Sequence, residues 1–251
     1  MVQARDCLDF YCHLYTQSQL SSDPESDVNP EHQASDHASV ELYLDVFNRW
    51  VMAFKAMTTA LDHSMSDQEK HAVQTLKMKQ LGFQSSLDLL SRDAEFDNQM
   101  LWDNYNATFE HTLDIAESLL QASSPQVRTS SPKRKTFFTL DVGIVESLYD
   151  VAHRCRDPLI RRRAIRLLYA YPRQEGMWDG VLAARVAERI VEIEESGLGV
   201  VRTCADVPDW ARTSEACPIF DPEHRKAILC YQRAASAERN FRAPVREVIQ
   251  W

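Results

Sequence analysis

Residues 40–61 read VELYLDVFNRWVMAFKAMTTAL and contain large apolar side chains at spacings of three and four. These side chains are Tyr43, Phe47, Trp50, Phe54, Met57 and Leu61. Because an α-helix has about 3.6 residues per turn, this spacing places the six side chains on one face of a helix. The stretch therefore predicts a long helix that packs one apolar face into a core.

The same spacing returns along most of the chain. It predicts further helices over residues 66–90, 101–120, 144–155, 158–171 and 177–196. Ser66 and Asp157 are typical helix caps, Pro158 suits a first helical turn and Gly197 suits a helix end. The 251 residues include only six glycines, so the turns of an all-β protein are missing. We expect an all-α fold, arranged as an antiparallel helical bundle or a short helical stack.

The helical spacing fades after Gly197. Residues 200–204 and 226–231 are rich in β-branched and aromatic side chains, and prolines lie between them. This pattern is compatible with a small β-hairpin near the C-terminus.

Composition divides the chain into a short polar front and one long domain. Residues 1–39 predict a short helix followed by a disordered loop, and residues 40–251 predict a single helical domain. Residues 123–136 carry four serines and two prolines up to Lys135, which indicates a flexible linker. The run Lys133-Arg134-Lys135 in this linker fits a solvated loop, with a nuclear-import signal as the alternative.

Charge and motif content argue against several function classes. A formal net charge of −9 repels polyphosphates, so we expect no large DNA-binding surface. The sequence lacks an apolar run of membrane-spanning length, and its six cysteines include no C-x-x-C pair. It also lacks a nucleophile elbow, a phosphate-binding glycine loop and a zinc-binding histidine pair. We therefore expect no membrane association, no catalytic residues, no cofactor and no metal.

Two clusters of charged residues are the candidate interaction or structural motifs. The first surrounds Asp157 and consists of Arg154, Arg156, Arg161, Arg162, Arg163 and Arg166. Such a density of guanidinium groups suits an acidic peptide or a phosphate, and pairing with carboxylates of the same chain is the alternative. The second consists of Arg173, Glu175, Trp178 and Asp179 around a predicted turn, where ion pairs would fix the angle between two helices.

Four segments carry a resemblance to a known family. They read FTLDVGIVESLY (138–149), VAHRCRDP (151–158), IRRRAI (160–165) and YPRQEGMWDG (171–180). In this order they resemble the C-terminal regulatory region of fungal six-cysteine zinc-cluster transcription factors. The resemblance extends from about Val40 to the end of the chain. Glu146-Ser147 stands where the family commonly has proline, and the front of the chain is shorter than usual.

The six-cysteine zinc cluster itself is missing from this sequence. That cluster needs closely spaced thiolates to bind two zinc ions, and Cys7 and Cys12 alone do not supply them. The resemblance thus implies a regulatory or protein-interaction domain in transcriptional regulation, located in the nucleus or otherwise in the cytoplasm. It implies protein partners and allows a small-molecule effector, and direct DNA binding by this chain is not expected.

Two other interpretations stay open. The fold suits a small-molecule-binding protein or enzyme of fungal secondary metabolism, with an aromatic pocket beside Asp141 or His153. The pocket would be lined by Trp50, Phe54, Trp102, Tyr105 and Tyr149. The chain could also be a gene fragment whose upstream exon encodes the zinc cluster.

Overall fold

The computed structural model divides into two compact units, Met1–Phe96 and Asp97–Trp251. It describes residues 30–61, 63–90, 98–123, 137–139, 143–176, 178–221, 224, 226–233 and 245–250. Residues 1–29 of the expected front (1–39) and residues 124–136 of the expected linker (123–136) lie outside the described residues.

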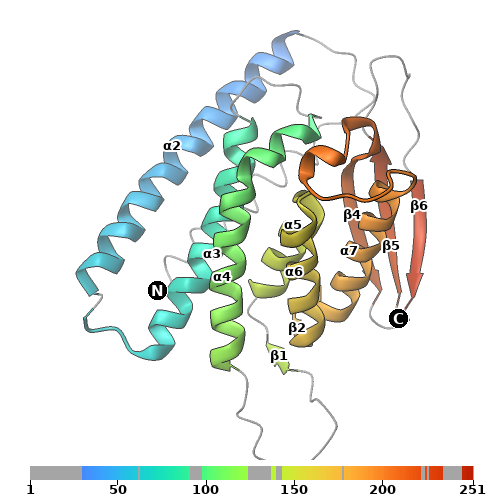
Figure 1. The fold of residues 1–251 in the computed structure, drawn as a ribbon. Coiled ribbons are helices and arrows are strands. Elements are labelled where there is room, and N and C mark those ends of the chain that lie inside the picture. The colour runs from blue at the N-terminus through green and yellow to red at the C-terminus, as the bar shows by residue number, and fades with distance from the viewer. Residues whose placement is uncertain are drawn as a thin grey trace, which may run out of the picture. The chain divides into compact units, whose positions relative to one another are not determined.

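The described part of the first unit is a helical hairpin of α2 (Pro30–Leu61) and α3 (Asp67–Leu90) (Figure 1). Its core contains the buried side chains of Phe47, Phe54, Leu76 and Leu87. The predicted apolar face is therefore confirmed at Phe47, Phe54, Trp50 and Met57, whereas Leu61 at the helix end is 45% exposed.

The starts of the two helices show how sequence sets helix bounds. Ser66 and Glu69 form a reciprocal cap, because Glu69 Oε2 accepts from the Ser66 N–H at 2.8 Å and Ser66 Oγ accepts from the Glu69 N–H at 3.3 Å. In contrast, α2 begins at Pro30, where we expected a polar loop up to Ser39. Proline fits the first helical turn because its missing N–H has no helical partner there.

The second unit begins with helices that pack around one another. They are η1 (Gln99–Tyr105), α4 (Asn106–Ser123), α5 (Ile144–Arg154), α6 (Pro158–Ala170) and α7 (Gly180–Glu195). Residues such as Leu113, Leu148, Ala164 and Ile190 are completely buried where these helices meet. The predicted helices are thus present, and α7 ends before Gly197, whose φ of 81° lies in the left-handed region.

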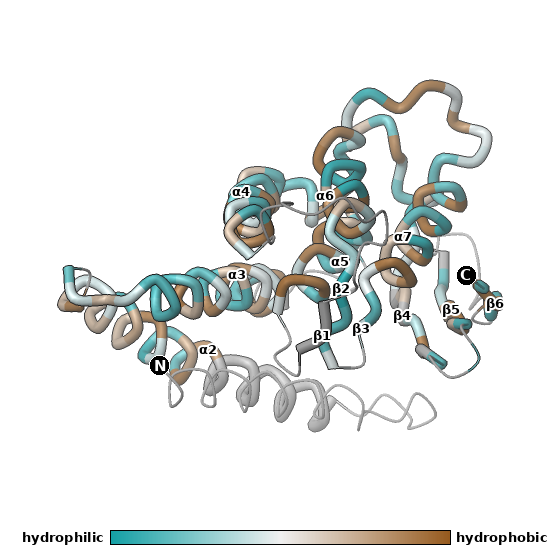
Figure 2. The backbone as a smooth tube through the Cα atoms, turned by 90° about the horizontal axis from the view of Figure 1, so that it is seen from below, coloured by the Kyte–Doolittle hydropathy of each residue, from teal (hydrophilic) through white to brown (hydrophobic). Residues whose placement is uncertain are grey.

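Two small sheets complete this unit. The first contains β1 (Phe137–Thr139), β2 (Arg173–Glu175) and β3 (Trp178–Asp179), with β1 parallel and β3 antiparallel to β2. The second is antiparallel and contains β4 (Thr213–Asp221), β5 (Lys226–Arg233) and β6 (Val245–Gln250), in that order. Figure 2 shows α7 lying between α5 and α6 on one side and this second sheet on the other.

The C-terminal sheet confirms the expected β structure but changes its members. Residues 226–231 form most of β5, as predicted, whereas residues 200–204 form no strand. Instead Asp206 Oδ2 accepts from the backbone N–H groups of Arg202 and Thr203, each at 2.9 Å. This side chain occupies donors that a neighbouring strand would use, and η2 (Cys204–Asp206) and η3 (Asp209–Ala211) follow.

The described helices include no segment that is both long and apolar enough to cross a membrane. The order of helices and strands described above confirms a mostly helical fold with a small antiparallel sheet near the C-terminus.

Candidate functional site: the buried arginine network

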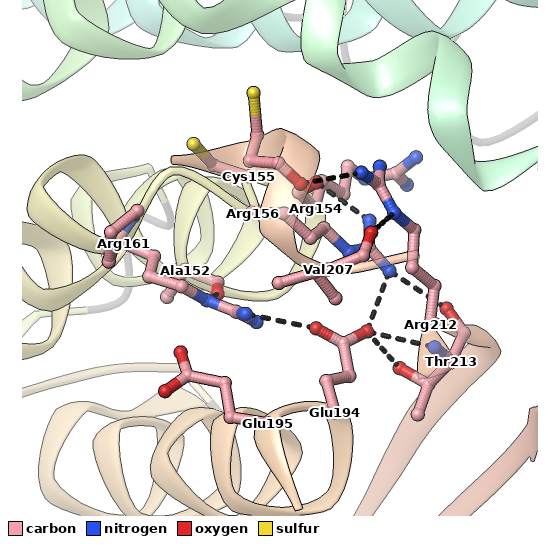
Figure 3. A network of polar contacts seen from close by, with 12 residues as sticks. Ala152, Arg154, Cys155, Arg156, Arg161, Glu194, Glu195, Val207, Arg212 and Thr213 are labelled. Atoms are coloured by element: carbon pink, nitrogen blue, oxygen red, sulfur yellow. Dashed lines mark hydrogen bonds and ion pairs between the residues drawn. The ribbon is translucent and has the colours of Figure 1, made fainter. Parts of the chain in front are cut away.

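Arg156 and Arg161 converge on the carboxylate of Glu194 in the interior of the second unit (Figure 3). Arg156 lies between α5 and α6, Arg161 lies in α6, and Glu194 lies in the last turn of α7. Arg156 Nη2 is 2.8 Å from Glu194 Oε1, and Arg161 Nη1 is 2.9 Å from Glu194 Oε2. All three side chains are at most 1% exposed. One carboxylate therefore balances two guanidinium groups away from solvent.

Thr213, the first residue of β4, completes this network. Glu194 Oε1 accepts hydrogen bonds from the backbone N–H and the hydroxyl of Thr213, at 2.8 and 2.9 Å. Arg156 in turn donates to the carbonyl oxygens of Thr213 and Arg154, at 2.9 and 2.7 Å. The network thus joins the C-terminal sheet to the helices through charge-assisted hydrogen bonds.

The charge state of Glu194 follows from these neighbours. Burial alone would raise its pKa, but the positive charges of Arg156 and Arg161 and the Thr213 N–H outweigh burial and hold the pKa at about 2. For Arg156, burial lowers the pKa and the Glu194 charge opposes that effect. Glu194 is therefore an ionised structural carboxylate that holds no proton to donate near neutral pH.

Arg212 forms a second buried centre that the sequence analysis missed. Its guanidinium makes a two-pronged pair with Asp103, at 2.8 and 2.7 Å, and its Nε donates to the carbonyl of Val207 at 2.8 Å. It also donates to the carbonyls of Gln99 and Cys204, each at 2.9 Å. Arg212 is 0% exposed. Its sequence neighbourhood gives no signal, because its partners lie up to 113 residues away.

The remaining arginines of the first cluster lie nearer the surface. Arg154 pairs with Asp150, and its guanidinium carbon lies 4.2 Å from the ring centroid of Trp102. The other members are distributed along α6: Arg162 pairs with Glu195, Arg163 pairs with Asp114 and Glu117 of α4, and Arg166 is exposed. The structure thus divides the cluster into two interior arginines and four at the periphery, instead of one continuous basic surface.

Glu175 and Arg173, from the second cluster, form another buried pair. Glu175 Oε2 accepts from the backbone N–H groups at the start of α5, those of Gly143, Ile144 and Val145, at 2.9, 2.9 and 3.0 Å. Its other oxygen lies 3.0 Å from Arg173 Nε. A carboxylate at a helix N-terminus satisfies donors that lack helical partners and favours the helix dipole. Glu175 therefore fixes β2 against the start of α5.

The other predicted site residues have local roles in the structure. Asp157 Oδ1 accepts from the N–H groups of Leu159 and Ile160, at 2.9 and 3.2 Å, and so caps α6 as the sequence predicted. Asp179 caps α7 by accepting from the Leu182 N–H at 2.9 Å. The Trp178 ring centroid lies 5.5 Å from that of Tyr149.

The aromatic residues predicted to line a pocket are divided between the two units. Trp50 and Phe54 stack with centroids 4.9 Å apart in the first unit. In the second unit, Tyr149 stacks on His153 at 5.0 Å. Burial, followed by the nearby Arg154 charge, lowers the pKa of His153 to about 4, so the imidazole is neutral. Asp141 lies outside the described residues.

Burial raises the pKa of the Cys155 thiol to about 12, so it is protonated at neutral pH. Among the described residues, no group of three or more His, Cys, Asp or Glu side chains is arranged to hold a metal ion.

The fold and its network define a mostly helical unit whose interior arginines bind carboxylates of the same chain. No family model and no solved structure matches the chain. The chain is 39% identical over 113 residues to the aspercryptin biosynthesis cluster-specific transcription regulator of Emericella nidulans. The match covers 43% of this chain and 18% of the relative. The chain therefore contains a region similar to part of a fungal transcription regulator.

Proposed function

We propose that this chain is a regulatory, protein-interaction domain of fungal transcription-regulator type, which acts in the nucleus on pathway genes. The observation that carries the proposal is the 39% identity over 113 residues to a cluster-specific transcription regulator. Identity at this level over 113 residues supports a shared fold and a related role, and the match spans 18% of that relative.

The charge distribution supports a role through protein partners and not through DNA. Nonspecific affinity for DNA comes from lysines and arginines that replace counterions on the phosphates. Here 28 Lys and Arg stand against 37 Asp and Glu, and Arg156, Arg161 and Arg212 are fully buried beside carboxylates. These three guanidinium groups are buried and paired with carboxylates, so they do not contact a phosphate backbone at the protein surface.

A tethering assay tests the regulatory role. The whole chain is fused to a heterologous DNA-binding domain and expressed in a fungal host with a matched reporter gene. We expect reporter output to change severalfold relative to the DNA-binding domain alone. Glu194→Gln should abolish the change by destabilising the second unit. Glu192→Gln, on the exposed side of the same helix, should retain it.

The outcome against the proposal is equally specific. If the wild-type and Glu192→Gln fusions accumulate in the nucleus but leave the reporter at the level of the DNA-binding domain alone, the chain is not a regulatory domain. Direct DNA binding is measured separately by fluorescence anisotropy with duplex DNA at moderate salt. Tight, salt-sensitive binding by the untethered chain would contradict the protein-partner mode.

A further inference from the structure

The two edges of the C-terminal sheet differ in how they are protected. Strand β4 carries Pro218 and an irregular register between Ser214 and Cys217. Proline and bulges both hinder the addition of another strand. Strand β6 has the sequence VREVIQ, with no proline, glycine or lysine, and its register with β5 is regular over six pairs. Figure 1 shows β6 at the outer edge of this sheet.

A row of apolar side chains crosses the outer face of the sheet and reaches β6. Ile219, Ile228 and Val248 are directly paired across the three strands. Ile219 and Val248 are 55% and 59% exposed. The opposite face, with Ala227 and Leu229 completely buried, packs toward α7. The apolar row therefore ends at β6, whose outer edge no other described strand covers and whose outward face also carries the exposed Arg246.

The inward-facing charge on β6 is already neutralised. Charged side chains on an edge strand commonly prevent strand addition. Glu247, however, pairs with Arg189 of α7 through two contacts of 3.0 and 3.1 Å from Arg189 Nε. This pairing holds the Glu247 carboxylate against the helix, so it does not guard the edge.

We propose that β6 pairs antiparallel with β6 of a second copy of this chain, with Val248 opposite Val248 on the two-fold axis. A two-fold axis perpendicular to the sheet keeps outward residues opposite outward residues. The register centred on Val248 pairs Arg246 with Gln250 and Glu247 with Ile249 of the second copy. The apolar row then runs unbroken across six strands, and apolar pairs directly opposite one another stabilise such sheets.

Neighbouring registers are less favourable. A two-fold axis through Glu247 would place Val248 opposite Arg246 and so interrupt the apolar row. An axis through Ile249 would leave Val245, Arg246 and Glu247 without partners in β6 of the second copy and would place Val248 opposite Gln250. The Val248 register keeps the apolar row continuous and uses five of the six residues of β6. This proposal concerns self-association and does not depend on the proposed regulatory function.

Sedimentation velocity of the full chain over a concentration series tests the self-association. We expect a reversible dimer in the wild type. Val248→Lys places two ammonium groups opposite each other and should raise the dimer dissociation constant by at least about tenfold. Ile219→Lys is the matched control, because Ile219 is similarly exposed on the same face but lies on β4. It should leave the dissociation constant close to the wild-type value.

Cysteine cross-linking tests the register itself. In Val248→Cys the two new side chains face each other with Cβ atoms about 5 Å apart, and copper–phenanthroline oxidation should join them as a covalent dimer. In Arg246→Cys they are offset by four residues, about 13 Å along the strand, and should not cross-link above the level of the wild-type chain. A wild type that stays monomeric up to its solubility, or equal cross-linking of both variants, would overturn the proposal.

Discussion

Replacing Glu194 by glutamine tests whether the buried network stabilises the second unit. The change keeps the size of the side chain and leaves one oxygen to accept from Arg156 Nη2 and the Thr213 N–H, which now lie at 2.8 Å. It removes the negative charge that balances Arg156 and Arg161. Two guanidinium groups with at most 1% exposure then share no anion within this network.

The size of the effect follows from the cost of an unbalanced buried charge. Removing one partner of a buried ion pair costs about 3–5 kcal/mol. The pKa of Glu194 gives a compatible value, because its fall from 4.5 to about 2 on folding corresponds to about 3 kcal/mol of stability at neutral pH. Domains are stable by only about 5–15 kcal/mol in total. We therefore expect Glu194→Gln to remove a large part of the stability of this unit and to lower its midpoint temperature by about 10 °C.

Urea unfolding followed by circular dichroism measures this change. The two units can give separate transitions, and only the transition of Asp97–Trp251 should move. Glu192→Gln is the control, since Glu192 is 63% exposed and its pair with Arg189 is a surface pair. A surface pair of this kind contributes less than about 1 kcal/mol.

Acid titration gives a second readout of the same prediction. In the wild type, Glu194 stays ionised in the folded chain while its unfolded counterpart protonates below pH 4.5, so stability is lost as the pH falls from 4.5 to about 2. Glu194→Gln should lack this contribution. If Glu194→Gln and Glu192→Gln have the same free energy of unfolding at neutral pH, or the same acid dependence, the reasoning about the buried network is wrong.

Three further predictions concern the same unit. Glu175→Gln weakens the acceptor at the start of α5 and turns an amide donor toward Arg173, so we expect a loss of about 2 kcal/mol in urea unfolding; an unchanged midpoint would show that this carboxylate is dispensable. Asp157→Ala removes the cap of α6 and should cost about 1 kcal/mol, whereas Asp157→Ser should restore most of it; equal losses in both variants would rule out capping. His153 stays neutral when folded and protonates when unfolded below pH 6.5, so stability should decline from pH 6.5 to about 4 by at most about 3 kcal/mol. His153→Gln should remove that decline, as measured by thermal melts across this pH range. A decline that persists in His153→Gln would contradict its assignment to His153.

Local patterns predicted the helices well because their causes are local. Phe47 and Phe54 repeat at helical spacing, and both are buried in the first unit's hairpin. The caps at Ser66 and Asp157 lie within three residues of the N–H groups that they accept from. Such interactions are visible in any short window of sequence. The strand expected at residues 200–204 is absent, by contrast, because Asp206 accepts from the backbone N–H groups of Arg202 and Thr203. Strand propensity does not take this competition into account.

The arginine cluster was predicted as a motif, but its geometry was not. Arginine is rarely buried without a partner, so a run of arginines is typical of a solvated or ligand-binding face. Here Arg156 reaches Glu194, 38 residues away, and Arg212 reaches Asp103, 109 residues away. Pairings over such separations follow from the packing of α6 and α7 and of η1 and η3, and they have no signature in local sequence. This is why Arg212 was missed and why the cluster divides between interior and surface.

The positions of the buried and exposed groups bear on where partners can bind. An acidic ligand that bound Arg156 or Arg161 would have to draw it away from Glu194, and separating a buried pair costs about 3–5 kcal/mol before any contact is gained. Binding at the edge of β6 requires no such change, because Val248 is already 59% exposed. Binding at this edge therefore leaves the stabilising network intact. Folding and association then depend on different residues. Glu194→Gln should lower the free energy of unfolding. Val248→Lys should weaken self-association and leave the free energy of unfolding unchanged.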